Sequence, residues 1–119
     1  MTDMNVYYSP QNLGMTLIGS LSDDSLSYEF DIYIVVQDNK TGRVLAENDA
    51  GCSCPTPFEG ISLADMREIQ TLDAFRSDVK QWNERYDHRR ASKQEIDALE
   101  EKVRTALRRR AALKRYNHA

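Results

Sequence analysis

The chain has 119 residues, of which 40% are hydrophobic and 29% are charged, and its formal net charge is −3. A chain of this length forms one domain, and its longest apolar run, residues 32–36, is much shorter than the ~18 residues of a membrane span. Its two cysteines are too few for a disulfide scaffold. We therefore expect a single domain over residues 1–119, with no membrane segment and no secretory signal.

The charge is distributed unevenly along the chain. Residues 1–61 carry a net charge of −7, whereas residues 62–119 carry a net charge of +4. The last acidic residue is Glu101, and seven basic residues follow it. This asymmetry favours either docking of the two halves on each other or a partner of opposite charge.

Alternation with a period of two predicts three strands in the first half of the chain. The segments 15–21, 28–37 and 43–50 alternate between two faces, and the second of them is rich in β-branched and aromatic residues. Between the second and third segments, residues 38–42 are typical of a hairpin turn in which Gly42 takes a positive φ. Because the connections are short, we expect an antiparallel three-stranded meander.

The same alternation predicts which side chains share a face of the sheet. One face of the first strand carries Met15, Leu17, Gly19 and Leu21. In the second strand the even-numbered residues form an apolar face, and the odd-numbered face also turns apolar at Tyr33 and Val35. We therefore expect this end of the second strand to be covered on both sides.

The hydrophobic period becomes that of a helix after Gly60. Thr71 is a suitable N-cap, and Asp73 in the first turn suits the helix dipole. The apolar stripe of this first helix consists of Leu72, Phe75, Val79, Trp82 and Tyr86. Such a stripe indicates an amphipathic helix that can cover one face of the sheet.

A second helix is predicted from Ser92 to about Tyr116. Ser92 and Glu95 match the capping-box pattern, and acidic residues come early and basic residues late along the segment. Its apolar stripe consists of Ile96, Leu99, Val103, Leu107 and Leu113. Since strands precede helices, the pattern indicates an α+β fold, with a β part over residues 1–61 and an antiparallel helical hairpin in residues 62–119.

The loop between the two parts is unusual, because it holds both cysteines and two of the three prolines. The residues of interest are Cys52, Cys54, Pro55, Pro57 and Phe58. A disulfide across one residue would be strained, and a catalytic thiol would need a nearby base such as His88. We expect the two thiols to be reduced, metal-free and at least partly buried, and we expect Phe58 to plug the edge of the core.

A metal site at the two cysteines is the alternative hypothesis. Zinc takes about four ligands, and the chain reaches that number only if His88 and His118 join Cys52 and Cys54, or if two chains share the ion. The spacing of these four residues is unlike that of a zinc finger. This alternative describes a cysteine-dependent module that contacts nucleic acid through the basic helix.

The basic end of the second helix is the predicted interaction surface. Because this helix outlasts its partner, apolar residues in its last turns are expected to be exposed among basic ones. The predicted partner-binding residues are Leu107, Arg108, Arg110, Leu113 and Tyr116. An isoelectric point near 5.4 argues against nucleic acid as the partner. Two other interpretations are a solvated helix end that suits its own dipole and a helix end covered by the sheet or the N-terminal arm.

The block Gly51–Glu59 (Gly-Cys-Ser-Cys-Pro-Thr-Pro-Phe-Glu), preceded by residues 28–31 and 40–43, resembles a group of small uncharacterised proteins encoded by actinobacteriophages. The resemblance covers about residues 6–66. It implies a phage accessory protein in the cytoplasm of a bacterial host, and small phage proteins of this kind often bind a host protein. Together with the absence of a recognisable catalytic motif, this favours a non-enzymatic binding protein without a cofactor, acting on a host protein or on a second copy of itself.

Overall fold

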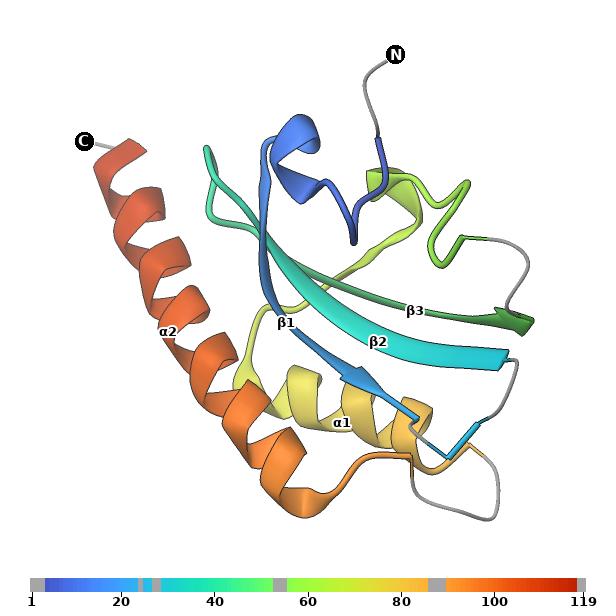
Figure 1. Cartoon of the computed structure of the whole chain (residues 1–119). Coiled ribbons are helices and arrows are strands. Elements are labelled where there is room, and N and C mark those ends of the chain that lie inside the picture. Colours follow the sequence, from blue (N-terminus) through green and yellow to red (C-terminus); the bar gives the residue numbers. More distant parts are fainter. Residues whose placement is uncertain (1–3, 24, 27–28, 53–55, 86–89, 118–119) are drawn as a thin grey trace.

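The computed structural model describes residues 4–23, 25–26, 29–52, 56–85 and 90–117. Its elements are η1 (Pro10–Leu13), β1 (Met15–Ser22), β2 (Glu29–Asp38), β3 (Val44–Cys52), η2 (Leu63–Asp65), β4 (Arg67–Glu68), α1 (Leu72–Asn83) and α2 (Lys93–Asn117), as Figure 1 shows. The predicted α+β fold is confirmed, with the strands before the two long helices. Within the described part of the chain, no helix combines the length and the apolar character needed to cross a membrane.

The sheet has four antiparallel strands in the order β1-β2-β3-β4, so the prediction of three strands was wrong by one. The additional strand β4 pairs only Arg67 and Glu68 with Ala46 and Leu45 of β3. Ile69 extends this contact, because its N–H donates to the carbonyl of Val44 at 2.8 Å. A strand of two residues cannot show alternation, and it lies in the part of the chain predicted to be only helical.

A bulge in β1 changes which side chains share a face. Leu17 lies opposite Val36 and Gly19 lies opposite Val35, so Ile18 is an extra residue in the ladder. The extra residue shifts the alternation by one position. Met15 and Leu17 therefore pack on one side of the sheet and Leu21 on the other, which corrects the prediction of a shared face.

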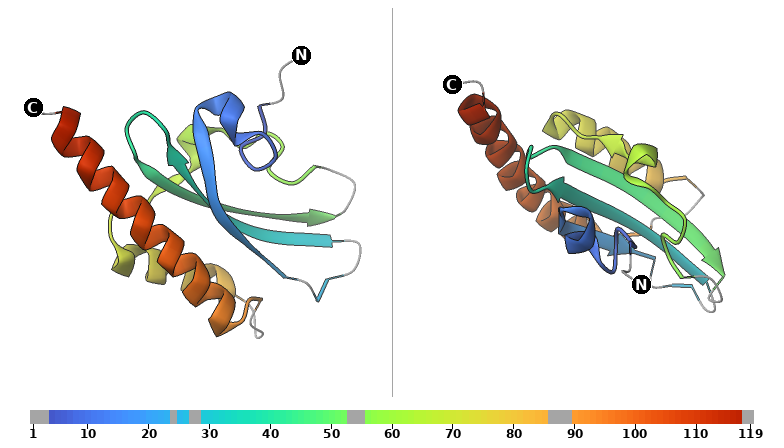
Figure 2. Two further views of the ribbon diagram at one scale, coloured as in Figure 1. Left: turned by 60° about the vertical axis from the view of Figure 1, so that its left-hand side comes forward. Right: turned by 90° about the horizontal axis from the view of Figure 1, so that it is seen from above.

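The sheet is covered on both faces, and the helices do not cover the face with the strongest alternation. The face with Tyr33 and Val35 packs against α1 and α2, through side chains that include Phe75 and Trp82. The opposite face packs against the N-terminal arm and the loop around Phe58, and its side chains in β2 are Ile32, Ile34 and Val36. Seen from above in Figure 2, α1 and the N-terminal arm lie on opposite sides of the sheet.

Both helices begin where capping predicts. The Oγ1 of Thr71 accepts a hydrogen bond from the N–H of Ala74 at 3.0 Å. At the second helix, Ser92 and Glu95 each accept a hydrogen bond from the backbone N–H of the other at 3.1 Å, which confirms the capping box. The first helix ends at Asn83, before Tyr86, which lies outside the described residues.

The second helix is much longer than the first and runs obliquely to it. The first half of α2 lies beside α1, whereas its second half continues past α1 toward the turn between β2 and β3 (Figures 1 and 2). Leu99, Val103 and Ala106 of α2 are buried against the sheet. The C-terminal half of α2 is therefore held by the sheet and not by the other helix.

Candidate functional site

The second half of α2 is fixed by contacts with the β2–β3 turn. The Nη1 of Arg110 donates to the carbonyl oxygen of Thr41 at 2.7 Å, and the Nε2 of Gln37 donates to the carbonyl of Ala106 at 2.7 Å. Gly42 has a φ of +78°, and a Cβ at this position would lie 2.9 Å from the Cα of Arg110. Glycine therefore allows the backbone of the turn to touch the backbone of the helix.

The structure divides the five predicted partner-binding residues into two groups. Leu107 is half-buried against the core, Arg110 is bonded to the turn, and the Cδ1 of Leu113 would lie 3.0 Å from a Cβ at Gly42. In contrast, Arg108 is exposed and the side chain of Tyr116 is 79% exposed. The first three residues attach the helix to the sheet, and the other two face solvent.

We call the exposed face at this end of the helix the α2 tip, and it consists of Arg108, Ala112, Arg115 and Tyr116. The spacing of these residues places them on neighbouring turns of one side of α2. Arg108 and Arg115 make no ion pair with any residue in the described ranges. The α2 tip is therefore a basic surface with one large exposed aromatic ring.

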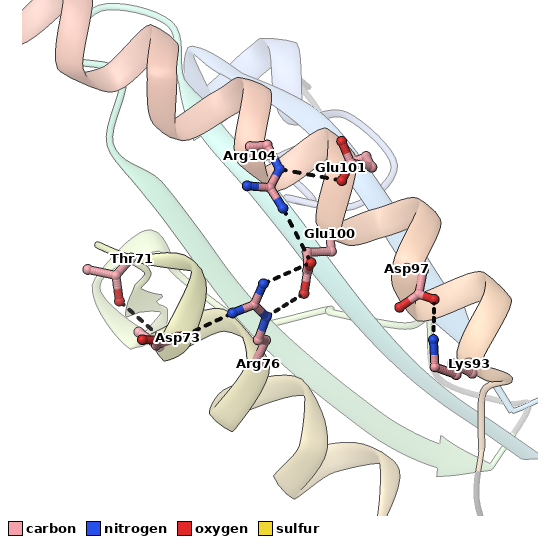
Figure 3. A network of polar contacts seen from close by, with 9 residues as sticks. Thr71, Asp73, Arg76, Lys93, Asp97, Glu100, Glu101 and Arg104 are labelled. Atoms are coloured by element: carbon pink, nitrogen blue, oxygen red, sulfur yellow. Dashed lines mark hydrogen bonds and ion pairs between the residues drawn. The ribbon is translucent and has the colours of Figure 1, made fainter.

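The first half of α2 has the opposite character, because its acidic side chains are paired. Figure 3 shows Arg76 of α1 between two carboxylates, with its Nε 2.8 Å from Oε1 of Glu100 and its Nη1 3.0 Å from Oδ1 of Asp73. The hydrogen bond from Arg76 holds the pKa of Glu100 below its usual value of 4.5. Arg104 also approaches Glu100, at 3.6 Å. Of these pairs, Arg76–Glu100 joins α1 to α2, and the other two lie within one helix each.

The cysteine loop is described only in part, because Cys54 and Pro55 lie outside the described residues. Cys52 ends β3 and carries a free, exposed thiol, which corrects the expectation that it is partly buried. It lies opposite Glu29 at the end of the sheet. In the ranges that the structure describes, no three His, Cys, Asp or Glu side chains gather as a metal site would require. The other proposed zinc ligands, Cys54, His88 and His118, fall outside those ranges.

Phe58 plugs the core as expected, on the face that carries the N-terminal arm. Its side chain is 1% exposed, and its ring centroid lies 5.5 Å from that of Tyr7. Its φ is +64°, and its N–H donates to Oδ2 of Asp49 at 2.8 Å. The carbonyl of Pro57 accepts from the side chain of Asn5 at 2.9 Å. Pro57 and Phe58 thus contact the N-terminal arm, and Phe58 also bonds to β3.

A buried ion pair at the end of the sheet was missed by the sequence analysis. The Nε of Arg90 pairs with Oδ2 of Asp31, and the two side chains are only 2% and 12% exposed. The Nε1 of Trp82 donates to the other oxygen of Asp31 at 2.7 Å. The sequence held one indication of this pair, which is the acidic residue Asp31 inside the otherwise apolar segment 30–36. This cluster joins β2 to the connection between the helices.

A second polar network was also missed, and it joins the sheet to α1. The hydroxyl of Tyr33 donates to Oδ2 of Asp78 at 2.8 Å, and Arg67 of β4 approaches Oδ1 of the same carboxylate at 2.7 Å. Burial, followed by the charge of Asp78, raises the pKa of Tyr33 well above its usual value. The Nη1 of Arg67 also contacts Glu47 of β3 at 2.7 Å. These contacts explain why β4 lies where it does.

Residues 4–109 match a family described as a domain of unknown function, DUF7574. The chain belongs to this family. The match includes the sheet, α1 and most of α2, but it ends before Arg110, so most of the α2 tip lies beyond it. A comparison with curated proteins found no match. A comparison with solved structures also found none.

Proposed function

We propose that this DUF7574 protein is a non-enzymatic accessory protein of phage origin that binds an acidic surface of a protein in the cytoplasm of its bacterial host. The α2 tip is the proposed contact. A second copy of the chain is the other protein to which this surface could bind. The phage origin and the host compartment come from the resemblance of the motif Gly51–Glu59, and the binding role comes from the geometry of α2.

The observation that carries the proposal is the exposure of Tyr116, at 79%, beside arginines without an ionic partner in the described part of the chain. Tyrosine and arginine are, with tryptophan, the residue types that most often contribute large binding energies at protein interfaces. The helix below them is rigid, because Arg110 and Leu113 hold it on the β2–β3 turn. A preformed surface loses little entropy on binding.

Charge favours a protein over nucleic acid as the partner. The chain as a whole has a net charge of −3, and residues 1–61, which contain the three long strands, carry a net charge of −7. A polyanion as large as duplex DNA would be repelled by much of this molecule, whereas a local acidic patch on a protein would meet only the α2 tip. The proposal of binding and not catalysis is supported by the Tyr33–Asp78 and Asp31–Arg90 pairs, which join packed elements.

The test is a capture experiment with two variants of equal charge change. The binding variant carries Arg108→Glu, Arg115→Glu and Tyr116→Ala. The control variant carries Lys80→Glu in α1 and Arg85→Glu just after the end of α1, and both of these positions are exposed. Circular dichroism checks that both remain folded. The immobilised proteins are exposed to a lysate of an actinobacterial host at low and high salt, and captured proteins are identified by mass spectrometry.

The proposal predicts a host protein that the wild type and the control retain and the binding variant loses, and whose capture falls at high salt. Light scattering identifies self-association as a doubling of mass that only the binding variant abolishes. Tighter binding to a DNA duplex than to any captured protein contradicts the proposal, and so does equal capture by all three proteins.

A further inference from the structure

The strand β1 forms a free edge of the sheet with an unusual composition. Its eight residues, Met15–Ser22, include no charged side chain and no proline. Only β2 pairs with it, and its outward backbone groups have no hydrogen-bond partner in the ranges that the structure describes. Proteins usually protect such edges with charges, prolines or bulges. Here the only such device within β1 is the bulge at Ile18.

A groove runs between this edge and the second half of α2. Its volume is about 290 Å³, and Leu17, Ile18 and Ala106 form its apolar part. Lys102 and Arg109 of α2 also line it, and its described lining includes no acidic residue. We call this feature the edge groove. It lies wholly within the part of the chain that matches the family.

The basic side of the edge groove lies close to β1 because Gly19 has no side chain to keep α2 away. A Cβ at this position would lie 2.6 Å from Cδ1 of Leu99 and 3.7 Å from Cδ of Lys102. Lys102 and Arg109 are exposed and have no ionic partner among the residues described. Two positive charges without an ionic partner in the described ranges therefore lie beside the free edge of an uncharged strand.

We propose that the edge groove binds an extended, acidic segment of a partner protein, which pairs with β1 as an added strand. Main-chain hydrogen bonds to β1 would supply affinity, and Lys102 and Arg109 would select acidic side chains on the face of the added strand that points toward α2. This inference goes beyond the proposed function, because it concerns a sheet edge and not the α2 tip.

Charge also argues against a second copy of this chain as the added strand. An antiparallel pair of β1 strands would have a two-fold axis near Gly19, which would bring the two Lys102 side chains to the same side of the joined sheet. Like charges so placed repel each other. The same charges attract an acidic segment, so they select the partner and oppose self-pairing.

The test uses a peptide as long as β1 that alternates glutamate with valine or threonine, and a second peptide with lysine in place of glutamate. Binding is followed by nuclear magnetic resonance of the labelled protein at low salt. The groove variant carries Lys102→Glu and Arg109→Glu. The matched control is the tip variant Arg108→Glu and Arg115→Glu, which changes the charge equally on another side of the same helix.

We expect the acidic peptide to shift the amide signals of residues 15–22 and to slow their hydrogen exchange. The groove variant should bind this peptide at least about tenfold more weakly, which corresponds to ~1.4 kcal/mol. The tip variant should bind the acidic peptide within about twofold of the wild type. This expectation does not depend on whether the α2 tip captures a host protein. These results would support the edge groove independently of the proposed function.

Four results would overturn the inference. The first is equal binding of the lysine peptide, and the second is an equal loss of binding in the tip variant. The third is the absence of any shift in β1 at a large excess of the acidic peptide. Protection of the β1 amides without peptide, together with a doubled mass, would assign the edge to a second copy and would also reject the acidic segment.

Discussion

Gly42 and Arg110 are in backbone contact, since a Cβ at position 42 would lie only 2.9 Å from the Cα of Arg110. This contact joins the β2–β3 turn to a helix that begins only at Lys93, far away in the sequence. It holds one side of the second half of α2 against the turn, and the other side faces solvent as the α2 tip. Glycine is required both by the close approach and by its φ of +78°.

The substitution Gly42→Ala should lower the free energy of unfolding by about 2–4 kcal/mol, because a positive φ costs an L-residue ~1–2 kcal/mol and the helix must also move. Urea denaturation measures the change. Gly60→Ala is the matched control, since Gly60 has a φ of +82° and nothing lies within 4 Å of its Cβ position. It should cost only the backbone part, and an equal loss in both variants would contradict the proposed contact.

Removal of one partner of the Asp31–Arg90 pair should be strongly destabilising. The variant Arg90→Met leaves the carboxylate of Asp31 buried with only Trp82 as a described donor, and we expect a loss of about 3–5 kcal/mol in urea denaturation. The double variant Asp31→Leu and Arg90→Met should recover much of this loss, because it leaves no unpaired charge. A double variant as unstable as the single one would show that the pair itself is required.

The Arg76–Glu100 pair should make a pH-dependent contribution to stability. Since the hydrogen bond from Arg76 lowers the pKa of Glu100 below its unfolded value of 4.5, the ionised carboxylate stabilises the fold above that pH. The contribution is lost as the pH falls through the folded-state pKa. Thermal unfolding of Arg76→Gln, Glu100→Gln and the double variant should show coupling at neutral pH that is lost once the pH is below the folded-state pKa of Glu100. Coupling of equal size at low pH would contradict this assignment.

At position 58, the usual stability order of glycine and alanine variants should be reversed. Loss of its buried ring should lower the free energy of unfolding by about 3–5 kcal/mol. Because its φ is +64°, Phe58→Gly should be more stable than Phe58→Ala by ~1 kcal/mol, whereas glycine is usually the less stable of the two. Urea denaturation of both variants tests this order. The usual order would mean that the loop changes conformation when the ring is removed.

Local features of the sequence were sufficient to predict most of the secondary structure. The stripes of α1 and α2, the caps at Thr71 and Ser92, and the hairpin turn with Gly42 all depend on neighbours within a few residues. The exposed positions Arg108 and Tyr116 were also predicted as surface, because they lie beyond the end of the shorter helix. Such features depend on helical period, capping and turn geometry, which are encoded locally.

Contacts between distant segments decided the rest, and no local pattern carries them. The bulge at Ile18 reverses the faces of β1 because β2 sets the register, and β4 forms because Arg67 reaches Asp78 and Glu47. The partners of Leu113 and Arg110 are in the β2–β3 turn, far away in the sequence. Sequence alone therefore determined the three long strands, the two long helices and the charge of the C-terminal end. Only tertiary packing decided which of those side chains became interior contacts and which stayed exposed, because burial depends on what the folded chain brings alongside.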